Sequence, residues 1–385
     1  MSRYRLYPTG EQEQRLTLYC SHARYVWNLA VEQLGYSTRE RRMPGFAEQS
    51  RQLTEGRHEF GWLREVPTVV GQQALRDFRQ ACTNWWGGTH RRPTWRKKGQ
   101  HEGFRVTDGH GIRVEQINRR WSQAWIPALG WIKFRRTRAV PDASSFRVTR
   151  DSADRWHIAF AVIPEPIAAP GNFEIVGVDR GVAVTLAYSD GTMLHAPQPA
   201  GVKTAAQALS RCKRGSNRRR KVRARVAAVH ARNADRRKDF IEKASTDLAR
   251  RYDLIRVEDL RIANMTRSAK GTIEQPGRNV RQKAGLNRSI MAGGWGLFVA
   301  RLQDKAPGRV ETINPAYTSQ TCSRCRHVDR NSRKNQALFC CTACGHTAHA
   351  DVNAAKVIAA GRAVRGAETV SALKRVPQRT GPRVA

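Results

Sequence analysis

Two cysteine pairs constrain the fold of this 385-residue chain more tightly than any other feature. Two residues separate the members of each pair, and fifteen residues lie between the pairs. The four cysteines are Cys322, Cys325, Cys341 and Cys344. Four thiolates at this spacing suit one tetrahedral zinc ion with no open position, so the site is structural. Cys340 does not give the two-residue gap and is excluded. The spacing therefore predicts a zinc ribbon, a module found in binding proteins as well as enzymes.

The charge of the chain is the second constraint. Lys and Arg number 69 against 32 Asp and Glu, which gives a formal net charge of +37. This excess predicts a polyanionic partner, and nucleic acid is favoured because neutralising its phosphates drives binding. An anionic membrane would also attract this charge, but we find no apolar run of membrane-spanning length, signal peptide or lipidation motif. We therefore predict a cytoplasmic protein without a membrane partner.

The N-terminal part combines strand and helix signals. Residues 3–8 alternate as a strand does, and Thr9 and Gln12 form a capping-box signature that opens a helix. The polar residues 35–62 predict loop or short helix, and apolar residues at helical spacing predict a second helix at 69–86.

Short alternating runs then recur through residues 103–163, separated by Gly, Pro and Asp, and they lie at 104–106, 112–114, 131–134, 146–148 and 156–163. They predict a small antiparallel sheet or barrel, with Arg and Lys on its outward face. The Pro-rich residues 164–171 have the composition of a linker, and we expect a domain boundary there.

Two basic segments are candidates for nucleic-acid contact. The loop 91–98 sets an aromatic residue among Arg and Lys, which suits backbone contact with base stacking, although a solvated loop with a docked Trp is the alternative. The segment 211–250 has helical spacing and a dense positive charge that would repel itself without an anion nearby, although such runs are often only a solvated face. The candidate contact residues are Trp95, Arg96, Lys97, Lys98, Arg218, Arg219, Arg220, Lys221, Arg223 and Arg225.

An acid inside an apolar run marks the second half. Residues 175–191 predict two β-strands, and 192–195 can add a third. Burying the Asp179 carboxylate alone is costly, so it needs a counter-ion or a metal, unless it only caps a turn at the strand end. Gly177 and Gly181 flank it and predict the close approach of another backbone or a ligand.

The remaining elements follow in order. Residues 253–260 predict a buried strand ending in two acids, and the polar, basic residues 264–288 predict a mobile loop. An amphipathic helix is expected at 290–306 and a strand at 310–313. Residues from Gly361 onward are rich in Arg, Gly and Pro and are expected to be frayed or disordered.

Three separated acids are candidates for one site. Asp351 stands where an Ala-rich helix begins, and taken alone it would be interpreted as an N-cap. Asp179 and an acid at 258 or 259 belong to strands of the same α/β domain. Three carboxylates together repel each other unless divalent cations neutralise them, and such a cluster can hold two Mg²⁺ ions for phosphodiester cleavage. A mixed α/β order that starts with a hairpin and carries Asp on its first strand is the ribonuclease-H-like arrangement.

Six motifs match a known family in order and spacing. They are Arg24-Tyr-Val-Trp-Asn28, Gly177-Val-Asp-Arg-Gly181, Val257-Glu-Asp-Leu260, Asn314-Pro-Ala-Tyr-Thr-Ser-Gln-Thr-Cys322, the knuckle from Phe339 to Gly345, and His349-Ala-Asp-Val-Asn-Ala-Ala355. On these motifs the chain resembles, over most of its length, the TnpB family of insertion-sequence OrfB proteins, kin to compact type V CRISPR effectors. One departure is Arg180, where many relatives carry a neutral residue, and its charge bears on metal affinity.

The resemblance implies an α/β multidomain protein with four parts. These are a wedge β-barrel (1–10 and 91–170), a helical recognition insert (11–90), an RNase H-like (RuvC) nuclease domain (171–313 and 346–385, with a basic bridge-type helix at about 211–250), and a zinc-ribbon insert that binds target nucleic acid (314–345). It also implies that Asp179, Glu258 and Asp351 form a catalytic triad, which selects Glu258 over Asp259. Asp179 would bridge two Mg²⁺ ions, and the other two acids would each bind one.

The implied function is an RNA-guided DNA endonuclease encoded by a transposable element. Its partners would be a guide RNA from the transposon end and a target double-stranded DNA, cut beside a short motif. It would work in the bacterial cytoplasm, at the nucleoid when bound to DNA. The alternatives are a nuclease-inactive RNA-guided repressor, a strand-transfer transposase using the same carboxylates, and a zinc-ribbon RNA-binding protein without metal-dependent cleavage.

Overall fold

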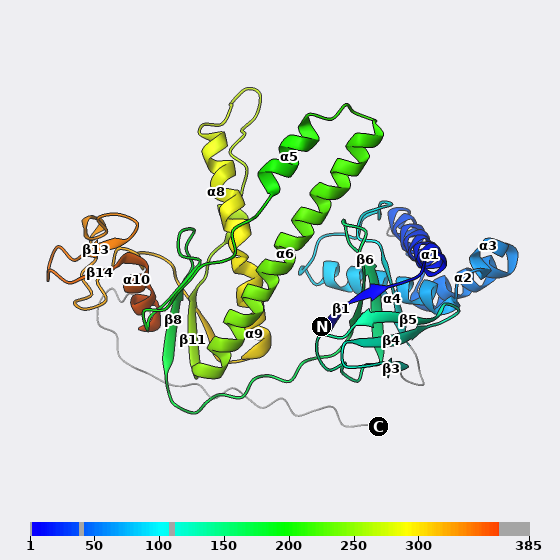
Figure 1. Ribbon diagram of the computed structural model, residues 1–385, viewed down its shortest axis with the longest axis horizontal. Helices are drawn as coiled ribbons and strands as arrows, with labels where there is room; N and C mark the ends of the chain where they lie inside the picture. The colour runs from blue at the N-terminus through cyan, green and yellow to red at the C-terminus, as the bar shows by residue number, and fades with distance from the viewer. Residues whose placement is uncertain (1, 38–41, 108–111, 362–385) are drawn as a thin grey trace. The chain divides into compact units, whose positions relative to one another are not determined.

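The computed structural model describes residues 2–37, 42–107 and 112–361 (Figure 1). The chain divides into two compact units. The first comprises the residues up to 165 together with 198–238, and the second comprises 166–197 and the residues from 239 onward. The first division falls inside the stretch predicted to be a linker. The prediction of a frayed C-terminal tail concerns 362–385, which lie outside the described residues.

The first unit contains a seven-stranded sheet in which all neighbouring strands are antiparallel. Its strands are β1 (Ser2–Tyr7), β2 (Gly103–Thr107), β3 (Val114–Gln116), β4 (Trp121–Ile126), β5 (Gly130–Arg135), β6 (Ser145–Arg150) and β7 (Trp156–Phe160). The order β2-β6-β7-β1-β5-β4-β3 places the N-terminal strand at the centre. Alternate side chains such as Tyr4, Phe134 and Phe160 fill the core. The antiparallel sheet was predicted, whereas β4 was not.

Four helices accompany this sheet: α1 (Gly10–Gly35), α2 (Phe46–Glu59), α3 (Gly61–Arg64) and α4 (Thr68–Trp86). The capping box predicted at the start of α1 is present, because Thr9 accepts from the Gln12 N–H and Gln12 accepts from the Thr9 N–H. Apolar residues at helical spacing along α1, from Leu16 to Leu34, are buried. The stretch 35–62 is more helical than predicted, since α2 and α3 occupy much of it.

The second unit contains a five-stranded sheet with the order β10-β9-β8-β11-β12. Its strands are β8 (Ile175–Asp179), β9 (Leu186–Tyr188), β10 (Met193–Leu194), β11 (Leu254–Glu258) and β12 (Val310–Ile313). The three strands β8, β9 and β10 are joined antiparallel, and β11 and β12 continue the sheet in parallel with β8. Val176, Val178 and Ile255 lie in its core, so the strands predicted from β-branched residues are confirmed.

The other helices are α5 (Val202–Ser210), α6 (Asn217–Arg251), α7 (Ile262–Met265), α8 (Val280–Gly293), α9 (Trp295–Lys305) and α10 (Ala350–Ala359). The basic helix predicted at 211–250 is α6. The prediction of a loop at 264–288 is wrong for its last third, because α8 occupies residues 280–288. The single helix predicted at 290–306 is broken at Gly294, whose positive φ of 67° ends α8 and starts α9. Within the described residues, no helix is long and apolar enough to cross a membrane.

Candidate active site and zinc ribbon

Two of the predicted acids end neighbouring parallel strands. Val178 of β8 pairs with Val257 of β11, so Asp179 and Glu258 are the next residues on adjacent strands that run in the same direction. Carboxyl ends of parallel strands meet at one edge of a sheet, where ligands of α/β folds commonly bind. Glu258 is buried, whereas the neighbouring Asp259 is exposed.

The third acid, Asp351, comes from the first turn of α10 and is buried. It is not the N-cap that its position suggested, because the His349 Nδ1 accepts from the Asp351 N–H at 3.3 Å and caps the helix. The helix packs directly on β8, where a Cβ atom added to Gly177 would lie 2.1 Å from the Ala355 carbonyl oxygen. The close backbone approach predicted at Gly177 is therefore confirmed, and it brings α10 alongside β8, the strand that ends at Asp179 (Figure 1).

The electrostatics show that the three acids lie together. Burial, together with the nearby charges of Glu258 and Asp351, raises the pKa of Asp179 to about 7. Burial also raises the pKa of Glu258. Desolvated carboxylates that repel one another favour protonation or a bound cation. The structure thus brings together all three acids that the sequence singled out.

Three further side chains contact these acids or their backbone. Thr318 donates a hydrogen bond of 2.6 Å to the Glu258 carboxylate, and Arg333 forms an ion pair of 2.9 Å with Asp351. The buried Arg180 guanidinium donates to the Glu258 carbonyl oxygen, and burial lowers its pKa while Glu258 and Asp179 oppose that shift. Thr318 stands in the motif 314–322, whose sequence alone indicates no role for it. Arg333 lies in the polar stretch between the cysteine pairs and carries no local signal.

The spacing of the acids differs from that of a cage for a single ion. Among the described residues, the cysteine quartet is the only group of three or more His, Cys, Asp or Glu whose ligand atoms all lie within 4.8 Å of one another. Two-metal centres hold ions about 3.5–4 Å apart, so their ligands spread more widely than those of one ion. The three acids therefore do not form so tight a cluster, although their carboxylate oxygens are ligands of the kind that hard divalent cations take.

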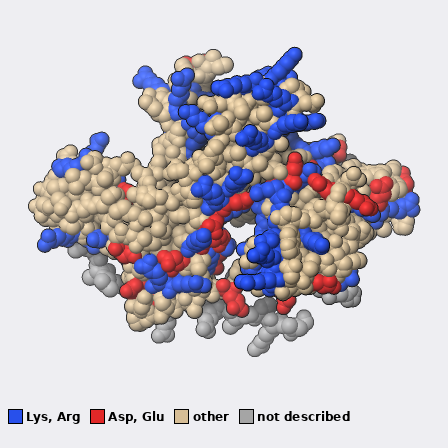
Figure 2. Space-filling model, in the orientation of Figure 1, with Lys and Arg blue, Asp and Glu red and all other residues tan. Residues whose placement is uncertain are grey.

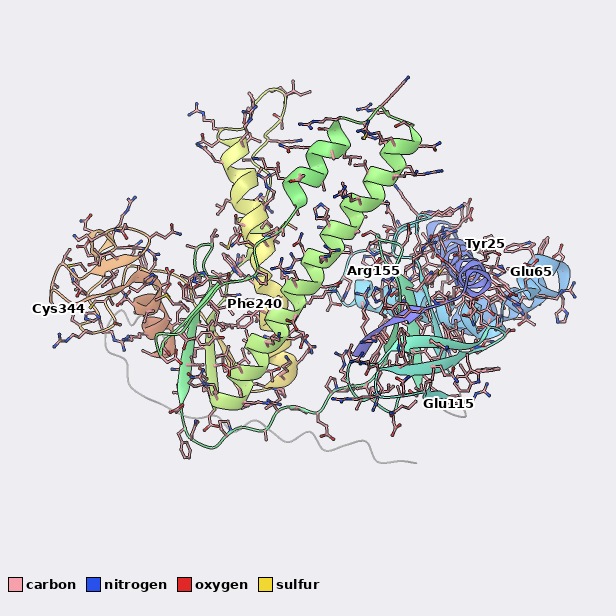
Figure 3. The ribbon with its side chains drawn as sticks, in the orientation of Figure 1. Tyr25, Glu65, Glu115, Arg155, Phe240 and Cys344 are labelled. Carbon is pink, nitrogen blue, oxygen red and sulfur yellow. The ribbon has the colours of Figure 1, made fainter. Side chains whose placement is uncertain are left out.

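The cysteine quartet forms a compact site in the ribbon. The Sγ atoms of Cys322 and Cys344 are 3.8 Å apart, and those of Cys325 and Cys341 are 3.5 Å apart (Cys344 is labelled in Figure 3). Tetrahedral zinc with Zn–S bonds of about 2.3 Å requires sulfur separations of about 3.8 Å. The backbone N–H groups of Cys344 and Ala343 lower the pKa of Cys341, whereas hydrogen bonds with the neighbouring thiols raise the pKa of Cys325, so the proton is shared unevenly within the quartet.

The ribbon is joined to the acid site through α10. Its small sheet pairs β13 (Leu338–Cys340) with β14 (Thr347–His349), and β14 leads directly into α10. Asn353 is fully buried, donates to the Thr321 carbonyl at 2.8 Å and accepts from the Ser323 N–H at 2.9 Å. These bonds fix the first cysteine knuckle to the helix that carries Asp351. Cys340 lies outside the quartet, in agreement with its exclusion.

The candidate nucleic-acid contacts fall into two groups, which are cations exposed to solvent and cations that already contact other groups of the protein. Five of the six on α6 are exposed, and Figure 2 shows Lys and Arg covering the end of α6 that follows α5. Arg219 is the exception, because its guanidinium donates to the carbonyls of Leu209 and Cys212 at 3.2 and 3.0 Å. In the loop 91–98, Arg96 lies 3.6 Å over the Trp27 ring and burial lowers its pKa to about 10, whereas Lys97 and Lys98 are exposed.

Family models match along the chain. A helix-turn-helix model of OrfB proteins matches residues 2–39, the OrfB model of IS605 elements, described as "Probable transposase", matches 157–269, and a Cas12f1-like TNB domain matches 295–358. The second match contains Asp179 and Glu258, and the third contains the ribbon and Asp351. The Cas12f1 chain in a cryo-EM structure of a Cas12f1–sgRNA–target DNA complex is similar in fold, with a TM-score of 0.57 and 14% identity over 91% of this chain and 83% of that chain. The chain therefore has a fold similar to that of a compact Cas12 protein, and its ribbon region matches the model of a Cas12f1-like TNB domain.

Relatives identify the family to which the chain belongs. InsQ of Escherichia coli K12, provisionally named an RNA-guided DNA endonuclease, is 34% identical over 377 residues, which cover 94% of this chain and 92% of InsQ. A protein of Streptomyces pristinaespiralis with a provisional name of the same kind is 29% identical over 408 residues, which cover 98% of this chain and 93% of that protein. The chain belongs to the TnpB family, the OrfB proteins of insertion sequences.

Proposed function

We propose that this protein is an RNA-guided DNA endonuclease encoded by a transposable element, which cuts target DNA beside a short motif by phosphodiester hydrolysis. The observation that carries the proposal is the meeting of three acids, two of them buried, where β8, β11 and α10 come together, in a chain that matches relatives named RNA-guided endonucleases along nearly their whole length. The net charge of +37 supports polyanionic partners. The guide RNA would derive from the transposon end.

Each part of the chain has a proposed role within this function. The seven-stranded sheet with its helices would serve as the wedge barrel and recognition insert, and the five-stranded sheet as the RuvC-like nuclease domain. The exposed cations of α6 would contact phosphates, which recognises backbone shape while guide pairing supplies sequence. The cysteine quartet would hold a structural zinc that keeps the ribbon folded beside α10.

Asp179, Glu258 and Asp351 would hold two Mg²⁺ ions. When bound, these ions supply a nucleophilic water near neutral pH and stabilise the charge that develops on the scissile phosphate. Thr318 orients the Glu258 carboxylate through its 2.6 Å hydrogen bond. Arg333, which pairs with Asp351 here, is a cation on the ribbon side of the site that can release its carboxylate and neutralise a phosphate oxygen instead. Arg180 holds the Glu258 backbone at the end of β11.

The test is to co-express the chain with its native locus, purify the complex and sequence the bound RNA. Target DNA matching that RNA is then incubated with the complex in Mg²⁺. Wild type and Asp259→Asn, which changes the exposed neighbouring acid, are expected to cut the DNA. Asp179→Asn should bind RNA and DNA normally and leave the DNA intact, because it removes one ligand charge from the site.

The other readings give different products in the same assay. Target binding without cleavage by the wild type would support a repressor. Joined products in the presence of donor DNA would support a strand-transfer transposase. Absence of guide-dependent target binding would overturn the proposal and favour an RNA-binding protein with a zinc ribbon.

A further inference from the structure

Two sequence features that the acid site does not use meet in the first unit. The indole Nε1 of Trp27 donates to the Thr94 carbonyl at 2.9 Å. The Asn28 side chain donates to the Arg96 carbonyl at 3.1 Å and accepts from the Arg96 N–H at 2.8 Å. Helix α1 therefore fixes the loop backbone on both sides of Trp95. These three hydrogen bonds hold the loop backbone that carries Trp95 in one position on α1.

The Trp95 ring is nevertheless left in solvent, with 55% of its surface exposed. It lines a cavity of about 320 Å³ together with Tyr25 and Leu29 of α1, which are 44% and 41% exposed. The Tyr25 ring is itself supported by the edge of Trp62, with centroids 4.9 Å apart (Tyr25 is labelled in Figure 3). The fold thus holds apolar and aromatic surfaces in place without burying them, which is a preorganised binding surface.

The charges around the cavity select the kind of group that fits. Arg24 lines it, but its guanidinium is occupied by Glu102 at 2.7 and 2.9 Å. The exposed acid Glu32 also lines it and would repel a phosphate. Lys97 and Lys98 do not line the cavity, but they are exposed, follow Trp95 and Arg96 directly in sequence, and place positive charge on the same loop. A flat, uncharged ring would enter the cavity while the phosphates attached to it stay near the lysines.

We propose that this cavity binds one unpaired nucleobase, stacked on Trp95, with its flanking phosphates near Lys97 and Lys98. The inference rests on the proposed function, since it takes nucleic acid to be the partner. Base stacking on an aromatic ring tolerates every base, so the cavity adds affinity without reading sequence. The base comes either from the guide RNA or from a strand of the target DNA, and both present the same chemistry.

The first experiment measures the affinity of the full-length chain for a fluorescent single-stranded oligothymidylate over a range of salt concentrations. Trp95→Ala should weaken binding roughly tenfold, without changing the slope of log K against log salt, because stacking releases no counter-ions. Trp95→Phe should bind nearly as wild type. The double variant Lys97→Ala/Lys98→Ala should flatten the slope by about 1.4.

The matched control is Trp86→Ala, which removes another exposed tryptophan, 54% exposed on α4 and outside this cavity. It should bind like wild type. The inference is overturned if Trp95→Ala binds like wild type, if Trp86→Ala weakens binding equally, or if Trp95→Ala flattens the salt slope as the lysine variant does.

Ultraviolet crosslinking of the RNA-bound complex, with the adducts mapped by mass spectrometry, distinguishes the two sources. An adduct on Trp95 or Tyr25 before DNA is added would assign the base to the guide RNA, and one that appears only with target DNA would assign it to the DNA. A complex that cleaves DNA but gives no such adduct would overturn this inference and leave the proposed function intact. A chain that binds oligonucleotides through Trp95 but never cleaves DNA would overturn the proposed function and leave this inference intact.

Discussion

At the scale of single residues, the acid site opposes folding. Asp179 is half-buried near two other carboxylates, and desolvation together with their charges raises its pKa from 3.8 to about 7. A carboxyl group whose pKa is higher in the folded than in the unfolded chain binds its proton more tightly when folded. Its contribution to stability is therefore most favourable below pH 4 and becomes unfavourable as the pH rises to about 7. The repulsion that destabilises the metal-free protein is what favours divalent cations.

Replacing Asp179 by Asn tests this opposition. In magnesium-free buffer at pH 8, Asp179→Asn should raise the melting temperature, because the neutral amide removes the half-buried charge. The gain should shrink at pH 5, where the wild-type carboxyl is largely protonated, and Mg²⁺ should stabilise only the wild type. Asp259→Asn, at the exposed neighbouring acid, should have little effect at either pH. Thermal melts that show Asp179→Asn to be less stable than wild type at pH 8 would contradict this account.

At the scale of elements, the sequence predicted those helices and strands that contacts between neighbouring residues stabilise. The capping box at Thr9 and the β-branched run around Val178 depend on neighbours in sequence, and both elements were predicted. Strand β4 was missed because its partners on both sides, rather than its own pattern, stabilise it. The contacts of Arg333 and Thr318 with the acids span 18 and 60 residues of chain, so no window of sequence reveals them.

The junction between β8 and α10 depends on the absence of one side chain. A Cβ atom at Gly177 would lie 2.1 Å from the Ala355 oxygen and 2.3 Å from the Ala359 nitrogen, and both are backbone atoms. Gly177→Ala should therefore push α10, with Asp351, away from Asp179. We expect a loss of about 1–3 kcal/mol in the free energy of unfolding and a much larger loss of cleavage. Gly10→Ala, where no atom lies within 4 Å of the added Cβ, is the control. Wild-type cleavage by Gly177→Ala would show that the junction tolerates the shift.

The ribbon has too little core to fold by burial alone. Its hydrophobic cluster consists of Cys322, Phe339, Cys341 and Ala350. Cys341→Ser should lower the zinc content from about one ion per chain to near zero. Hydrogen exchange should then accelerate across residues 320–345, and cleavage should fall because Arg333 and Asn353 lose their positions. Cys340→Ser, which lies outside the quartet, should keep its zinc. Normal zinc content in Cys341→Ser would show that this thiolate is not a ligand.

At the scale of the whole molecule, the sequence predicted a nucleic-acid partner from charge but could not tell which cations are free. The net charge of +37 is a sum over all side chains, whereas only solvent-exposed Lys and Arg side chains can exchange water for a contact with phosphate. Arg219 and Arg96 belong to the predicted contact set, yet one binds carbonyl groups at the end of α5 and the other lies against Trp27. Their engagement depends on tertiary packing, which residue type and spacing do not reveal.

Neighbouring arginines of α6 allow a matched comparison between exposed cations and a cation that is bonded within the protein. Arg218, Arg220 and Arg223 are exposed, while Arg219 between them is half-buried. The triple variant Arg218→Ala/Arg220→Ala/Arg223→Ala should reduce the slope of log K against log salt for single-stranded RNA by about 2, since each lost phosphate contact contributes about 0.7. Arg219→Ala should leave the slope unchanged and lower the melting temperature, because the carbonyls of Leu209 and Cys212 lose their donor. If Arg219→Ala flattened the slope and the triple variant did not, the cations of α6 would have roles opposite to those that their contacts indicate.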